Sequence, residues 1–223
     1  MNTIWLVLLL ILNFIISWGN AKYCGRYWTE SKNEGGGFRA YIVCGYIMSI
    51  AGFTMVYSYL LLMIAPTVMQ AFEVNEELIV FFEELAANLV YLVIIFPILF
   101  SGVFIWIRGI QITWENRTVG NILASGWNTY AQIHNTISAM RNVPSAFGKV
   151  FEALFGGKKK KGQETLVLLA ILLVVIALLS GYFTASAIMK KADREYDAYD
   201  ILRKRASAQA GWRKQIFQNK KSS

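Results

Sequence analysis

The stretch of sequence that decides the fold is residues 40–72, which read AYIVCGYIMSIAGFTMVYSYLLLMIAPTVMQAF. These 33 residues contain no Asp, Glu, Lys or Arg, and the same is true of the 23 residues 85–107 and the 25 residues 165–189. A bilayer core of roughly 30 Å needs about 20 apolar residues at ~1.5 Å of helix rise each. Each stretch therefore predicts a transmembrane helix, at about 41–71, 85–107 and 165–189.

A fourth apolar stretch, at about residues 4–21, has two interpretations. As a cleaved signal peptide it would end at the small residues of Gly19-Asn20-Ala21, but no Lys or Arg precedes its apolar part. As a retained helix it has Trp18 and Tyr23 as interfacial anchors, and we favour this interpretation. The predicted fold is all-α: a polytopic membrane protein with four transmembrane helices, or three if the first is a cleaved signal.

The composition agrees with this class of protein. Hydrophobic residues make up 56% of the 223 residues and charged residues only 16%, a balance that suits lipid better than water. Cys24 and Cys44 are too few for a disulfide framework or a four-ligand zinc site, and His134 is the only histidine. We therefore predict no metal site and no cofactor.

The basic residues, which set orientation, leave the topology open. The first connection, residues 19–39, has four Lys and Arg, residues 73–84 have none, residues 108–164 have eight and the tail has ten. With four spans the tail lies outside, opposite the first connection and residues 108–164. With three spans the tail lies inside and these two segments lie outside. In either case we expect a multi-pass protein of a cell membrane, cytoplasmic or inner.

Small residues recur at helix-packing spacing in two of the predicted spans. They predict close helix contacts, within one chain or between copies, because small side chains let helix backbones approach. The candidate helix-packing residues are Gly45, Ser49, Gly52, Gly181 and Ala185.

Residues 108–164 are interpreted as an amphipathic, basic segment outside the membrane. Between residues 119 and 140 apolar side chains recur at close to 3.5 residues, which predicts an amphipathic helix whose polar face carries almost no charge. Pro144 is expected to end or redirect it. A second apolar stripe then precedes a lysine run, the pattern of an interfacial helix on anionic lipid head groups. The candidate lipid-surface residues are Phe147, Phe151, Phe155, Lys158, Lys159, Lys160 and Lys161.

The connection at residues 73–84 carries five glutamates and no basic residue. Glu73, Glu76 and Glu77 form a candidate cation-attracting loop, and Glu73, Glu77 and Glu84 would share one face of a continuous helix. In a symmetric oligomer these carboxylates would form a ring that concentrates cations. The alternative is a solvated loop whose charge suits the outer side of the membrane.

The tail, residues 190–223, is predicted to be a basic helix that continues the last span. Basic residues alternate there with aromatic ones, but no recognised nucleic-acid fold accompanies them, so nucleic acid is not an expected partner. The expected partners are the lipid bilayer, anionic lipid head groups, and further copies or subunits of a larger membrane complex.

No catalytic constellation is visible, because His, Asp, Ser and Cys do not cluster near a predicted membrane interface. The sequence therefore favours a non-enzymatic membrane protein that assembles with itself or partners, as a structural component of a secretion, transfer, envelope or viral apparatus. The alternative is a channel, pore-forming or transporter subunit.

Overall fold

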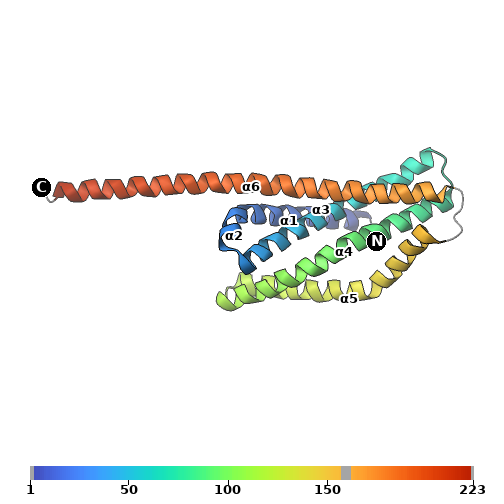
Figure 1. Ribbon diagram of the computed structural model, residues 1–223, viewed down its shortest axis with the longest axis horizontal. Coiled ribbons are helices and arrows are strands. Elements are labelled where there is room, and N and C mark those ends of the chain that lie inside the picture. Colours follow the sequence, from blue (N-terminus) through green and yellow to red (C-terminus); the bar gives the residue numbers. More distant parts are fainter. Residues whose placement is uncertain (1–2, 157–161, 222–223) are drawn as a thin grey trace.

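The computed structural model describes residues 3–156 and 162–221, and for residues 202–221 it describes the backbone alone. These residues form helices joined by short turns (Figure 1). In chain order the helices are α1 (Thr3–Arg26), α2 (Trp28–Glu34), α3 (Gly36–Ala71), α4 (Glu76–Glu115), α5 (Val119–Phe155) and α6 (Gln163–Lys221). The all-helical prediction is confirmed for the described residues.

Four of the helices are long and apolar enough to cross a membrane, as the sequence predicts. They are α1, α3, α4 and the part of α6 up to Ile201. The helices are longer than most of the predicted spans, since the chain stays helical through the charged residues that border the uncharged stretches. The amphipathic helix α5 is not among the four by hydropathy.

The turns between helices have local causes in the sequence. Gly35 and Gly36 have φ values of 65° and 53°, a left-handed conformation that glycine adopts without steric cost and that separates α2 from α3. The Asn75 side chain caps α4 by accepting a hydrogen bond from the Glu77 amide at 2.9 Å. Thr118 caps α5 in the same way, accepting from the Asn121 amide at 3.1 Å.

The helices lie side by side, except that the later part of α6 extends well beyond the others (Figure 1). α3 packs against α1, α4 and α6, and α4 packs against α5 as well as α6. One cluster of buried apolar residues joins α3, α4, α5 and α6; it contains Ala51, Phe82, Leu85, Ala86, Val90, Ile94, Val150, Leu166, Val167, Ala170, Leu173 and Val174.

The helix α5 continues through Pro144 and bends near it (Figure 1). Proline removes one backbone donor and pushes the preceding turn aside, so a bend at this position is expected. Of the two outcomes predicted for this proline, the structure therefore has the redirected helix.

The candidate helix-packing residues lie where α1, α3 and α6 meet. A Cβ atom added to Gly45 would come within 2.8 Å of Cys24 Sγ on α1, and one added to Gly52 would collide with Ser17 on α1. Ser49 and Ala185 are fully buried. These residues contact helices of the same chain.

Gly181 has the least space of the small residues on α6. An added Cβ atom would lie 2.7 Å from the Thr54 backbone nitrogen and 2.9 Å from the Ile50 carbonyl oxygen of α3, and backbone atoms cannot move aside cheaply. The contact therefore requires a residue without a side chain.

We predict that Gly181→Ala lowers the stability of the detergent-solubilised protein by about 1–3 kcal/mol, because it forces α3 and α6 apart. The matched control is Gly126→Ala on α5, where an added Cβ meets nothing within 4 Å. The measurement is the midpoint of thermal unfolding. Equal midpoints for Gly181→Ala and the unmodified protein would contradict the close contact.

Candidate functional site

The helix α5 is amphipathic in the opposite sense to a helix on a water-soluble protein. Its outward face carries large apolar side chains, with Leu123, Trp127 and Met140 exposed by 68%, 66% and 76%. Its inward face is polar, and Gln132 on it is buried against α4. An outward apolar face over an inward polar face is the arrangement expected of a helix surrounded by lipid or by apolar protein.

Four hydrogen bonds and one ion pair join α5 to α4 at successive positions along the two helices. Trp106 Nε1 donates to Thr129 Oγ1 at 2.8 Å, and Tyr91 Oη donates to the Ser138 carbonyl at 3.3 Å. Ordered along the pair, the contacts are Thr113 with Asn121, Trp106 with Thr129, Leu99 with Gln132, Tyr91 with Ser138 and Glu84 with Lys149. The two helices are therefore antiparallel, and α5 covers the entire uncharged part of α4.

This pairing gives the bundle two distinct ends. We call the end with the α3–α4 turn (residues 72–75) the glutamate end; α6 begins there, since Gly162 lies next to Leu78. The opposite end, which we call the tail end, holds the α1–α3 connection and the α4–α5 turn. Thr29 Oγ1 donates to Asp193 Oδ1 at 3.1 Å there. The first connection and the start of the tail thus share one end, whereas both predicted topologies separated them.

The glutamates of the candidate cation-attracting loop are exposed but not on one helix. Glu73 lies in the α3–α4 turn with a φ of 55°, so the helical face expected for Glu73 and Glu77 is interrupted. Glu76 and Glu77 lie in the first turn of α4. Carboxylates at that position are stabilised by the positive end of the helix dipole, which is a structural reason for their presence.

The candidate lipid-surface residues are placed in part. Phe147, Phe151 and Phe155 form an exposed stripe on the last turns of α5, with neighbouring ring centroids 6.4 Å and 4.9 Å apart. Lys158, Lys159, Lys160 and Lys161 fall outside the described residues. The stripe belongs to the part of α5 nearest the glutamate end, where Lys149 pairs with Glu84.

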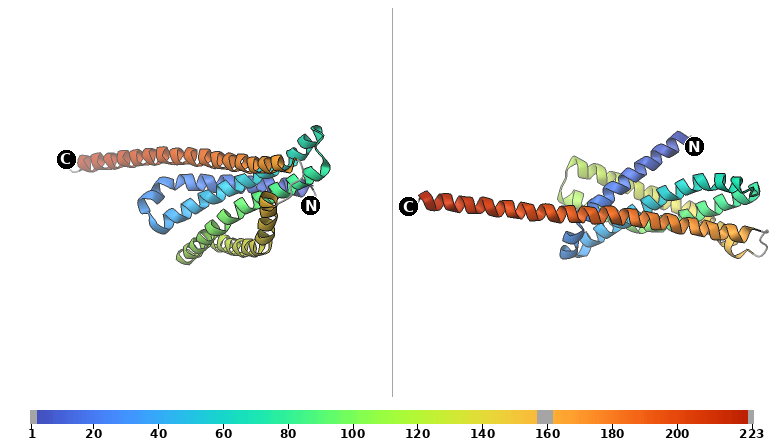
Figure 2. Two further views of the ribbon diagram at one scale, coloured as in Figure 1. Left: turned by 45° about the vertical axis from the view of Figure 1, so that its right-hand side comes forward. Right: turned by 90° about the horizontal axis from the view of Figure 1, so that it is seen from above.

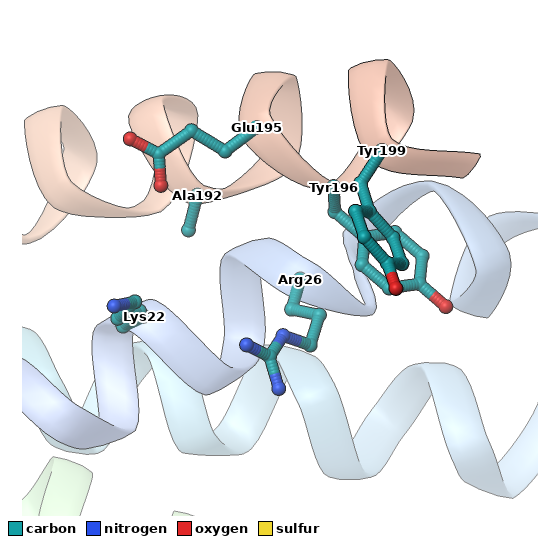
Figure 3. A pocket seen from close by; sticks show the side chains of 6 residues that line it. All are labelled: Lys22, Arg26, Ala192, Glu195, Tyr196 and Tyr199. Atoms are coloured by element: carbon teal, nitrogen blue, oxygen red, sulfur yellow. The ribbon is translucent and has the colours of Figure 1, made fainter. Parts of the chain in front are cut away.

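A cleft of about 330 Å³ lies at the tail end, between α1 and α6 (Figure 3). Lys22 and Arg26 line it from α1, and the lining residues on α6 are Ala192, Glu195, Tyr196 and Tyr199. The sequence alone did not identify this site, because α1 and α6 are separated by most of the chain. Their pairing depends on small residues: a Cβ atom on Gly25 would collide with the Met189 carbonyl.

Aromatic side chains surround this junction. The ring centroids of Tyr27 and Tyr196 are 6.0 Å apart, and those of Tyr23 and Tyr27 are 4.8 Å apart. The Arg39 guanidinium lies 3.9 Å from the ring centroid of Trp28. Tyrosine, tryptophan and arginine gather in this way at the level of lipid head groups, so the junction has the composition of a membrane interface.

Neither a metal site nor a reactive thiol pair emerges among the described residues. They contain no group of three His, Cys, Asp or Glu side chains placed to hold a metal ion. Cys24 and Cys44 are both buried and not bonded to each other. No family model, no curated protein and no solved structure matches this chain.

A signal for the position of α5 is nevertheless present in the sequence. Residues 118–140 contain no Asp, Glu, Lys or Arg, and this stretch of 23 residues is as long as the uncharged stretch of α4. Hydropathy does not reveal it, because Asn, Gln, Thr and Ser occupy the inward face. The absence of charge, rather than the average hydropathy, is the informative property.

We predict that a carbodiimide reagent joins Lys149 to Glu84 through an amide bond within one chain, because the two side chains form an ion pair across α4 and α5. Mass spectrometry of the proteolysed protein would identify the linked peptides. The matched control, Lys149→Gln, should lose this linkage and keep the other cross-links that the reagent forms. Failure to find the linkage in the unmodified protein would count against the antiparallel pairing.

Proposed function

We propose that this chain is a non-enzymatic, multi-pass component of a membrane-embedded apparatus, which assembles with itself or with partner proteins and holds out a basic helical arm. The observation that carries the proposal is the continuity of α6, a single helix of 59 residues. At ~1.5 Å per residue it is about 90 Å long, roughly three times the thickness of a bilayer core. One helix thus serves as span and as arm.

The arm is fixed to the bundle at its base. The hydrogen bond from Thr29 to Asp193, the ring contact of Tyr27 with Tyr196 and the close approach of Gly25 to Met189 hold the first turns beyond the span. A rigid base gives the arm a defined direction relative to the membrane. This supports a role in positioning a partner at a distance from the bilayer.

The arrangement of the helices supports five crossings of the membrane. If α3 and α4 cross, the α4–α5 turn lies at the tail end, yet α6 begins at the glutamate end and returns to the tail end. The chain between the α4–α5 turn and the start of α6 must therefore cross the membrane once more, and α5 does so alongside α4. Hydrogen bonds between α4 and the inward side chains Thr129 and Gln132 support this position, because a polar side chain in lipid needs partners within the protein.

The distribution of basic residues then favours one orientation. The tail end receives 16 of the 22 Lys and Arg residues: four in the first connection, ten in the tail, Arg117 in the α4–α5 turn and Arg108 in the last turns of α4. The other six, from Arg141 to Lys161, lie toward the glutamate end or in the α5–α6 connection. Basic residues are concentrated on the cytoplasmic side of membrane proteins, so the arm is assigned to the cytoplasm of a cell membrane.

The outward face of α5 supports assembly with another protein. His134 and Arg141 are exposed there among large apolar side chains. Ionisable groups facing hydrocarbon are costly, whereas a protein neighbour can supply hydrogen-bond partners. The alternative of a channel subunit would need a continuous polar path. The open groove of about 300 Å³ between α3, α4 and α6 does not supply one, because its lining is apolar and includes Leu61, Leu169 and Leu173.

We predict that the protein in lipid nanodiscs has a mass greater than one 25.2 kDa chain, through further copies or a stoichiometric partner, and that His134→Leu with Arg141→Leu shifts it to a single chain. The two leucines remove the polar contacts that a neighbouring protein would satisfy. The measurement is single-particle mass.

A matched control replaces exposed polar residues elsewhere: Thr67→Leu with Gln70→Leu on α3 should leave the mass unchanged. A single chain in the unmodified protein, combined with ion flux through liposomes that contain it, would contradict the proposal and favour the channel alternative.

A further inference from the structure

We infer that the cleft between α1 and α6 binds the head group of an anionic phospholipid on the same side of the membrane as the arm. Two cationic side chains, Lys22 and Arg26, line the cleft from α1, and the hydroxyl-bearing Tyr196 and Tyr199 line it from α6. Arg26 lies on the side of the tyrosines, and Lys22 lies across from Ala192 (Figure 3). Ammonium and guanidinium groups with nearby hydroxyl donors are the groups that bind phosphate oxygens.

The cations of the cleft are available for a ligand. Among the described residues no acidic side chain forms an ion pair with Lys22 or Arg26, and the contact found for Lys22 is with the Trp18 ring, 5.2 Å from its centroid. The one acidic lining residue, Glu195, lies near Lys191, whose Nζ is 3.9 Å from the carboxylate. The cleft with Lys191 therefore has a net positive charge.

The position of the cleft selects a lipid over a soluble phosphate. Lys22 and Arg26 end the apolar helix α1, one to two turns beyond Trp18, and the tyrosines of α6 follow its apolar span. Away from the cleft α1 and α6 diverge (Figure 2). The flank of α1 on the membrane side is exposed and apolar; it includes Leu8, Ile11, Leu12, Ile15 and Ile16.

This geometry matches the two parts of a phospholipid. The phosphate would lie in the basic cleft at the interface while the acyl chains follow the apolar flank of α1. Basic pockets between transmembrane helices on the cytoplasmic side are suited to such anionic head groups. The inference does not depend on oligomerisation, so it can fail while the proposed function stands.

The test uses the full-length protein in detergent with phosphatidylglycerol or phosphatidylcholine added, and native mass spectrometry counts the retained lipids. We expect preferential retention of phosphatidylglycerol by the unmodified protein. Lys22→Gln with Arg26→Gln should weaken it about thirtyfold, since each near-surface cation contributes about one factor of five. Both side chains are exposed, so thermal unfolding should be unchanged.

The matched control is Lys190→Gln with Arg194→Gln, which removes two cations near the same membrane level that do not line the cleft. This control should retain the lipid. Equal loss in both variants, or equal retention of the two lipids by the unmodified protein, would overturn the inference. Displacement of phosphatidylglycerol by millimolar inorganic phosphate would assign the cleft to a soluble anion instead.

Discussion

The antiparallel pairing of α5 with α4 is the interaction on which the rest of the architecture depends. In lipid, a polar side chain must find its partners within the protein, and α4 supplies them for Thr129 and Gln132 on the inward face of α5. Because α5 follows α4 back to the glutamate end, α6 starts at that end and leaves the bundle at the tail end. Without this return the arm and the first connection would lie on opposite sides.

The other helices are held by close approach rather than by burial from water. Lipid is as apolar as leucine, so packing in a membrane relies on small residues and on hydrogen bonds between helices. The Asn13 and Asn20 side chains donate to the Gly52 and Gly45 carbonyls at 3.1 Å and 2.7 Å. Each glycine thus gives α1 both the space and the acceptor it needs, and this anchors the helix that carries Lys22 and Arg26.

Much of the fold follows from the sequence because charge is so unevenly distributed along it. In lipid, the backbone N–H and C=O groups of a long uncharged stretch must be hydrogen-bonded within the protein, and a helix achieves this. The four long apolar helices and the all-α class are therefore predictable. The small residues Gly45, Gly52 and Gly181 also predict close contacts between helices, although their spacing does not identify the partner helix. Hydropathy understates α5, since polar residues on its inward face lower the average, although two of them, Thr129 and Gln132, are hydrogen-bonded to α4.

The site between α1 and α6 was not predictable, because it arises from residues far apart in the chain. In the sequence, Lys22 and Arg26 are two of the basic residues of the first connection, and Tyr196 and Tyr199 are aromatic residues of the tail. Only the crossing of α1 and α6 near Gly25 and Met189 brings them together. Local sequence patterns predict each helix separately, whereas the site forms only where α1 packs against α6.

The most direct test of this account is the sidedness of four positions. In a background with Cys24 and Cys44 replaced by serine, single cysteines at Lys32, Glu73, Asn116 and Ser207 would be labelled in intact cells and in inverted vesicles. We predict that Lys32, Asn116 and Ser207 are labelled from the cytoplasmic side and Glu73 from the opposite side. Labelling of Lys32 and Ser207 from opposite sides would contradict the five crossings and the position of α5.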